Sequence, residues 1–170
     1  MIAPTVERDA LIDGPYRYWL TRRWDAALPQ ALIVMLNPST ADASEDDHTI
    51  RKCNGFMERW GYGGYTVANL FAYRATDPKV MMAARAAGTD VVGPDNMRTL
   101  LYLSDRADLT LVAWGASTPK GTELHTHRVT QALAGAADLH CLGKTKTGAP
   151  RHPLMVGYDQ SRELFRARVA

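Results

Sequence analysis

Short, largely apolar runs recur along the chain, separated by segments with helical spacing. Apolar runs of about four to eight residues are typical of strands buried on both faces of a parallel sheet. Four such strands are predicted, at 31–36 (ALIVML), 65–72 (YTVANLFA), 109–114 (LTLVAW) and 139–142 (LHCL). The segment YRYWLTRRW at 16–24 is rich in aromatic residues and alternates roughly with polar ones, which predicts an additional N-terminal strand.

Between these runs, apolar residues recur every three or four positions, as on one face of a helix. In the segment 48–60, Ile50, Cys53 and Phe56 share such a face, and Asp46 or Asp47 is a suitable N-cap. Helices are also predicted at 78–87, 94–106, 122–135 and 159–169.

The alternation of strands and helices predicts an α/β protein with right-handed crossovers. We expect a three-layer α/β/α arrangement: a central, mostly parallel four-stranded sheet with helices on both faces, plus the N-terminal strand. The 170 residues fit a single domain, 1–170, with its core at about 30–156.

Composition narrows the class of protein. Hydrophobic residues make up 46% of the chain, which is ordinary for a globular fold, and the net charge of +2 decides nothing by itself. Cys53 and Cys141 lie far apart, which argues against a disulfide scaffold or an iron–sulfur cluster. No apolar run reaches the roughly 18 residues of a membrane span, and the first ten residues lack the apolar core of a signal peptide. We therefore expect a cytoplasmic protein without a membrane partner, monomeric rather than oligomeric.

Ligands of such sheets bind beyond the carboxyl ends of the strands. The segment Asn37-Pro38-Ser39-Thr40 leaves the first apolar strand there. Pro38 would fix the turn and aim Asn37 into a cleft, although Asn-Pro and Ser-Thr are also common in plain turns. Asn69 lies near the end of the next strand; it either pairs with a neighbouring loop or reads the edge of a planar base.

Two further segments at this edge are suited to phosphate groups. Residues 115–121 form a glycine-rich bend before a helix, whose amides can hold a phosphate beside Ser117 and Lys120. Residues 143–153 contain no acid and carry four candidate ligands: Lys144, Lys146, Arg151 and His152. The structural alternatives are an ordinary bend and a solvated basic loop.

A metal site is not expected. His125 and His127 are two residues apart and so do not share a helix face. The acidic loop that contains Asp42, Glu45, Asp46 and Asp47 could hold a cation, but a capped, acidic helix start explains it more simply.

Taken in order, these segments resemble the motifs of the uracil-DNA glycosylase superfamily. LNPST at 36–40 is similar to its first motif, and YTVANLFAYRATDP at 65–78 to its second strand and the segment after it. LVAWGAST at 111–118 is similar to its third strand, and PRHPLMV at 150–156 to its histidine motif. Ser39 stands where that family usually has glycine or tyrosine.

The chain resembles a bacterial and archaeal family of unknown function more closely. The shared marks are LNPSTAD at 36–42, Asp47-x-Thr49, and GxPRHPL at 148–154. This resemblance implies no activity, but it adds Asp47 and Thr49 to the candidate substrate-binding residues Pro38, Ser39, Thr40 and Asn69.

The glycosylase resemblance implies an N-glycosidic hydrolase that acts without a cofactor on a damaged or modified base in nucleic acid. DNA is the nucleic acid that we expect as its substrate. By this resemblance Asn37 would position the attacking water, Asn69 would read the base, and His152 would donate a hydrogen bond to the departing base. The phosphate contacts would come from Ser117, Lys120, Lys144, Lys146 and Arg151. The candidates for an aromatic residue that stacks on the base are Phe56, Tyr65 and Phe71.

Two other functions fit the same residues. One is a hydrolase of free nucleosides or nucleotides, which the modest net charge and the short HPL motif at 152–154 favour. The other is a module that binds a modified base or nucleotide without turnover.

Overall fold

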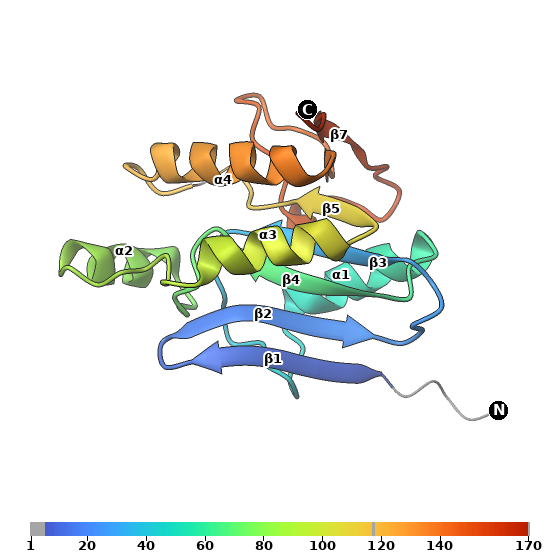
Figure 1. The fold of residues 1–170 in the computed structure, drawn as a ribbon, viewed down its shortest axis with the longest axis horizontal. Coiled ribbons are helices and arrows are strands. Elements are labelled where there is room, and N and C mark those ends of the chain that lie inside the picture. The colour runs from blue at the N-terminus through green and yellow to red at the C-terminus, as the bar shows by residue number, and fades with distance from the viewer. Residues whose placement is uncertain (1–5, 117, 170) are drawn as a thin grey trace.

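The computed structural model describes residues 6–116 and 118–169, and Figure 1 shows one sheet with helices packed against it. The strands are β1 (Glu7–Asp13), β2 (Tyr16–Arg23), β3 (Gln30–Met35), β4 (Gly64–Asn69), β5 (Leu109–Val112), β6 (Leu139–Cys141) and β7 (Glu163–Arg166). The helices are α1 (His48–Arg59), α2 (Pro78–Ala86), α3 (Asn96–Arg106) and α4 (Glu123–Ala136), with a 3-10 turn η1 (Pro153–Met155). Ser117, a predicted phosphate ligand, lies outside the described residues.

The sheet is larger and more mixed than the sequence predicted. Its seven strands in the described ranges run in the order β1-β2-β4-β3-β5-β6-β7. β4, β3, β5 and β6 pair in parallel, whereas β1–β2, β2–β4 and β6–β7 pair antiparallel. The α/β class is therefore confirmed, but the expected fold, a central four-stranded, mostly parallel sheet like that of uracil-DNA glycosylases, is wrong.

The two outermost strands account for much of this error. β1 was not predicted, and the segment that contains β7 was predicted as a helix over 159–169, which is wrong. Both strands lie at the edges of the sheet, and their residues are mostly exposed. An edge strand of this kind is held by backbone hydrogen bonds and needs no apolar run, so the pattern of side chains does not show it.

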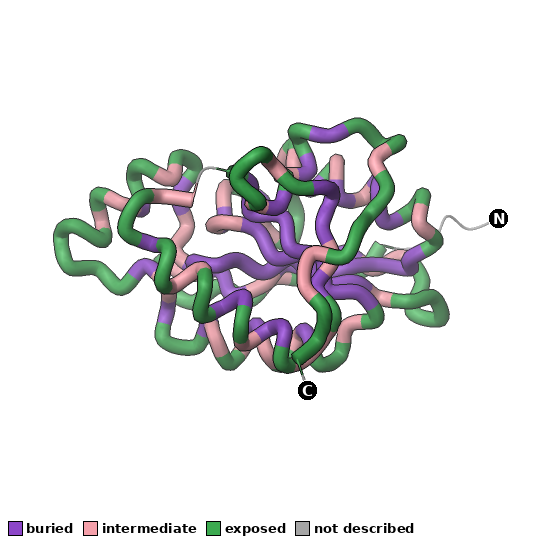
Figure 2. The backbone as a smooth tube through the Cα atoms, turned by 90° about the horizontal axis from the view of Figure 1, so that it is seen from above, coloured by how far each residue is buried: buried purple, intermediate pink, exposed green. Residues whose placement is uncertain are grey.

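Helices cover both faces of the sheet. Ile50, Cys53 and Phe56 of α1 pack with Ile33 of β3 in one buried cluster. Met81, Leu100 and Leu133, from α2, α3 and α4, form another cluster with β3 and β5 residues on the opposite face. Figure 1 shows α3 and α4 in front of the sheet and α1 behind it, and Figure 2 shows the buried residues concentrated along the central strands. No helix in the described ranges is long and apolar enough to cross a membrane.

A β-bulge in β2 decides where one buried charge lies. Trp19 pairs with Leu11 and Arg17 pairs with Ile12, so Tyr18 is an extra residue without a partner in β1. An extra residue breaks the two-residue alternation of a strand and re-aims the side chain beyond it. As a result Arg17, five positions before Arg22, contacts the same 41–47 loop that Arg22 contacts.

Candidate functional site

A cavity of about 460 Å³ lies beyond the carboxyl ends of β3 and β4. Its walls come from the segments after β3, β4 and β5, from the first turn of α1 and from the loop before η1. It brings together seven of the predicted site residues: Asn37, Ser39, Thr40, Asp47, Thr49, Asn69 and His152. Residues far apart in sequence meet here because parallel strands end at the same edge of the sheet.

A second cavity of about 450 Å³ adjoins the first. Both are lined by Leu36, Pro78, Trp114 and His152, which form their shared wall. The second cavity is mostly apolar and includes Arg151, another of the predicted ligands. Together the two cavities give room for a ligand with two parts.

The predicted lysines do not reach this site. Lys120, Lys144 and Lys146 are exposed and line neither cavity. The 143–150 segment turns back on itself, with a bridge between Lys144 and Pro150, so Lys146 lies at the tip of the turn while the end of the segment returns to the site. Pro38 is buried beneath the site, and its carbonyl accepts hydrogen bonds from Asn37 and Ala75.

Asn37 is held by its amide nitrogen. Its Nδ2 donates to the carbonyl oxygen of Ala75 at 2.8 Å and to that of Pro38 at 3.2 Å. Because both bonds use the nitrogen, the plane of the amide is fixed and Oδ1 is the group left to accept from a ligand or water. This arrangement can orient a water molecule but cannot take a proton from it.

Asp47 and Thr49 lie where α1 begins. Asp47 is the N-cap, and its Oδ1 accepts from the backbone N–H of Ile50 at 2.9 Å. His48, Thr49 and Ile50, the first turn of this 12-residue helix, line the cavity. The free amides and the dipole at the start of a helix favour a bound anion. Among the described residues that line the cavity, Asp47 has the one carboxylate side chain.

His152 is prepared to donate a hydrogen bond. Its Nδ1 accepts from the backbone N–H of Leu154 at 3.2 Å, so the neutral ring carries its proton on Nε2. Burial lowers the pKa of His152 below its usual 6.5, while the carboxylate of Asp47 acts in the opposite direction. Gly115 lies next to the Cβ of His152 and has a φ of +86°, a conformation that glycine adopts readily. Its backbone N–H donates to the Pro150 carbonyl.

Asn69 presents an unsatisfied amide oxygen at this cavity. The residue is 1% exposed, and its Oδ1 has no hydrogen-bond partner among the described residues. Its backbone carbonyl is fixed by Nδ2 of Asn96, at the start of α3, at 2.9 Å. A buried polar atom without a partner is destabilising, so its presence at a cavity indicates a ligand that supplies the missing donor.

Arg17 is the site residue that the sequence did not reveal. It is 3% exposed and lines the cavity, and its guanidinium donates to the carbonyl of Ala41. Its Nε has no partner, and the described residues give it no ion pair within 4 Å. Burial lowers the pKa of Arg17 to about 10, against the attraction of the Asp47 carboxylate, so the group is still a cation at neutral pH. The only signal in the sequence is an arginine that stands between two tyrosines, Tyr16 and Tyr18, in a predicted strand.

An aromatic wall comes from Trp114, two residues after the end of β5, which borders both cavities and is 5% exposed. Phe56, Tyr65 and Phe71, the candidates from the sequence, line neither cavity. Tyr65, for example, is buried and donates to Oδ1 of Asn54 at 2.6 Å.

The acidic loop before α1 is held by hydrogen bonds. Asp42 accepts from the backbone N–H groups of Glu45 and Ser44 and from the Ser44 hydroxyl, which lower its pKa to about 2. Burial raises the pKa of Asp46, but its bonds and ion pair with Arg22 outweigh burial, and the pKa is lowered. Among the described residues no group of three or more His, Cys, Asp or Glu side chains could hold a metal ion.

Comparison with known proteins identifies a family but no activity. The model of one family, described as "Protein of unknown function (DUF1643)", matches residues 17–154. The search of curated proteins and the search of solved structures each found no match. None of these comparisons supports the likeness to uracil-DNA glycosylases. The match covers most of the chain and includes the LNPSTAD and GxPRHPL motifs, and the chain therefore belongs to the DUF1643 family of unknown function.

Proposed function

We propose that this protein is a hydrolase that cleaves the N-glycosidic bond of a free nucleotide in the cavity around Asn37 and His152. The observation that carries the proposal is the presence, in one cavity, of a buried cation without a counter-ion and a buried amide oxygen without a hydrogen-bond partner among the described residues. These groups are Arg17 and Asn69. A ligand that satisfies both carries an anion and a polar planar group, as a nucleotide does.

The anion is assigned to Arg17. An isolated buried charge is strongly unfavourable unless it is paired. The first turn of α1 adds N-terminal amides to the same wall. A phosphate group suits both partners, because guanidinium groups bind phosphate through two parallel hydrogen bonds.

The base is assigned to Asn69 and Trp114. A side-chain amide can donate to and accept from the edge of a base in one plane. Trp114 lines both cavities, and an indole ring is a group on which a base can stack. The cavity volume of about 460 Å³ lies within the usual range for small-molecule sites.

The chemical step needs three groups. A water held by Oδ1 of Asn37 adds its oxygen to the anomeric carbon, while the bond from that carbon to the base nitrogen breaks and its electron pair stays on the base. The Nε2–H of His152 stabilises the negative charge that develops on the base, a role worth roughly 2.7–4 kcal/mol for a preorganised donor. Asp47 accepts the proton that the water releases, and this proton passes through solvent to the base nitrogen as the base leaves, so that Asp47 is again a carboxylate at the end of the step.

A free nucleotide is favoured over duplex DNA. Proteins that bind the DNA backbone place several cations along it. Here Lys120, Lys144 and Lys146 lie outside both cavities, and of the two arginines that line the cavities Arg17 is deeply buried and Arg151 is exposed. A single buried arginine suits one phosphate better than a nucleic-acid backbone.

The test is release of free base from a panel of ribo- and deoxyribonucleoside 5′-monophosphates, followed by chromatography. Asn37→Ala should lower kcat with little change in KM. Arg17→Met should raise KM for nucleotides about tenfold to a hundredfold, as expected for a lost charge-assisted bond, and leave nucleosides unaffected. Lys146→Ala is the matched control, and its kinetics should equal those of the unmodified protein.

Two results would overturn the proposal. Saturable nucleotide binding without release of base, at high protein concentration and long times, would make the protein a binding module. Base release only from oligonucleotides, lowered by Lys144→Ala or Lys146→Ala and steeply dependent on salt, would make it a nucleic-acid glycosylase.

A further inference from the structure

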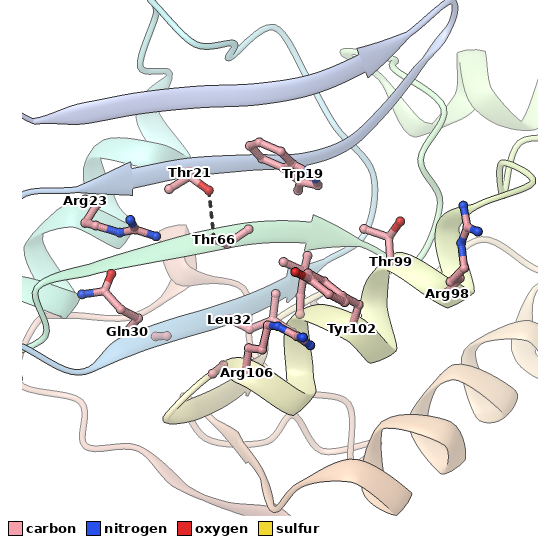
Figure 3. A pocket seen from close by; sticks show the side chains of 13 residues that line it. Trp19, Thr21, Arg23, Gln30, Leu32, Thr66, Arg98, Thr99, Tyr102 and Arg106 are labelled. Atoms are coloured by element: carbon pink, nitrogen blue, oxygen red, sulfur yellow. Dashed lines mark hydrogen bonds between the residues drawn. The ribbon is translucent and has the colours of Figure 1, made fainter. Parts of the chain in front are cut away.

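A groove of about 510 Å³ lies on the α3 face of the sheet, away from the site already described (Figure 3). It shares no lining residue with either of the other two cavities. Its floor is formed by β2, β3 and β4, and one of its walls is α3. The side chains that line it and carry the argument are Trp19, Thr66, Arg23, Tyr102, Leu103 and Arg106.

The groove exists because α3 does not extend over β2. In Figure 1 α3 lies in front of the central strands, whereas β1 and β2 have no helix in front of them. Trp19 and Thr21 of β2 are therefore only half-buried, and Tyr102 of α3 is 56% exposed. The hydroxyl groups of Thr21 and Thr66 are 2.9 Å apart and satisfy each other, which leaves the floor largely apolar.

The charge that surrounds this floor is of one sign. The lining residues include Arg23, Arg98 and Arg106 and no aspartate or glutamate. These arginines do form ion pairs, at 3.2, 2.8 and 3.8 Å, with three carboxylates outside the lining: Glu7, Asp95 and Asp105. Such exposed pairs are weak, so an incoming anion can replace them.

The Arg23 end is the better place for an anion. Nε of Arg23 is buried and has no hydrogen-bond partner among the described residues. The guanidinium of Arg106 lies at the same end, where α3 finishes, and is stacked on the ring of Tyr102 at 3.8 Å. Figure 3 shows Arg98 at the other end of the groove, beyond Thr99 and Tyr102.

We propose that this groove binds a small amphiphilic anion. Its apolar body lies on Trp19, Leu32 and Leu103, and its carboxylate, sulfonate or phosphate is held by Arg23 and Arg106. The volume is that of a small-molecule site, with apolar walls and a few polar groups that fix orientation. The proposal does not depend on the activity of the cavity around Asn37.

The test uses octanoate as the anionic probe and 1-octanol as its neutral counterpart. Binding to the ¹⁵N-labelled protein is followed by amide chemical shifts. We expect saturable shifts at Thr21, Thr66 and Tyr102, with octanoate binding about tenfold more tightly than 1-octanol, as one charge-assisted hydrogen bond would give. The double variant Arg23→Gln/Arg106→Gln should lose this preference, and Arg128→Gln, on exposed α4 surface, should keep it.

Three outcomes with the two probes would overturn the proposal. They are equal affinity for the two probes, shifts that map to the Asn37 cavity in place of the groove, and the absence of saturable shifts in a protein whose spectrum is that of the folded state. A helical acidic peptide that binds this face where octanoate does not would also contradict it, and would assign the groove to a protein partner.

Discussion

Arg17 and Arg22 are both buried on β2, yet among the described residues only Arg22 forms an ion pair. Nε of Arg22 donates to Oδ1 of Asp46 at 2.8 Å, and Nη2 forms an ion pair with the same oxygen at 2.8 Å. Nη2 also donates to the carbonyls of Asp42 and Glu45. Arg17 has one carbonyl partner and no carboxylate among the described residues. Arg22 thus holds the acidic loop in place, and Arg17 is available to a ligand.

Replacing each arginine by methionine should therefore have different consequences. Arg22→Met removes the buried partner of Asp46, which keeps its ion pair with the exposed Arg8 at 2.9 Å, and should lower the free energy of unfolding by about 3 kcal/mol. Arg17→Met removes a buried charge that has no counter-ion, so the free energy of unfolding should change by less than about 1 kcal/mol or rise. Urea unfolding at neutral pH without ligand measures both, and equal losses in the two variants would show that Arg17 is structural.

His152 should make the folded protein sensitive to acid. Its pKa is lowered in the folded state, so the unfolded chain binds a proton first as the pH falls. The stability that the neutral ring contributes is present above about pH 6.5 and is lost as the pH falls through the lowered pKa. Protonation also removes the acceptor for the Leu154 N–H.

The measurement is the urea midpoint of the unmodified protein and of His152→Gln between about pH 7 and pH 5. We expect the midpoint of the unmodified protein to fall more steeply over this range. His127→Gln, an exposed position on α4, serves as the control and should follow the unmodified protein. Parallel curves for His152→Gln and the unmodified protein would contradict the assignment.

The central strands of the fold can be predicted from the sequence, because a strand that is buried on both faces requires a continuous apolar run. The run at 31–36 coincides closely with β3, Gln30–Met35, and the helical spacing at 48–60 with α1. The edges are not accessible in this way, since the residues of β1 and β7 are mostly exposed and carry no such pattern. The number of strands and their direction depend on backbone pairing between distant segments.

The site shows the same division. Asn37, Asn69 and His152 could be placed at one cavity because each lies at or after the end of a predicted strand, whereas Asp47 was added by the family resemblance alone. Arg17 could not, because its position depends on the bulge at Tyr18, and nothing in a single sequence marks that extra residue.

Asp42 should stabilise the acidic loop in a way that depends on pH. Its pKa of about 2 is below the usual 3.8 because Glu45 and Ser44 donate hydrogen bonds to the carboxylate. Because the pKa is lowered in the folded state, the carboxylate contributes to stability above about pH 4, and this contribution is lost as the pH falls through 2. Asp42→Asn should flatten the dependence of the urea midpoint on pH in this range, whereas Asp105→Asn, on exposed α3 surface, should not.

Two glycines allow the coupling between backbone and site to be tested. Gly115 and Gly148 have almost the same φ, +86° and +82°, so alanine at either should lower the free energy of unfolding by about 1–2 kcal/mol. Only Gly115 touches the site: its N–H donates to the Pro150 carbonyl at 3.0 Å, and an added Cβ would lie 3.4 Å from that of His152. At Gly148 an added Cβ meets nothing within 4 Å.

Relaxation of the strained backbone in Gly115→Ala should therefore move the segment that carries His152. We expect the NMR titration of the His152 ring to change in Gly115→Ala and to be unaltered in Gly148→Ala, although both variants are destabilised to a similar extent. Base release, if the proposed activity holds, should fall at least about tenfold in Gly115→Ala alone, since small displacements of catalytic groups have large effects on rate. Identical titrations in the two variants would mean that the position of His152 is fixed by η1 and not by the end of β5.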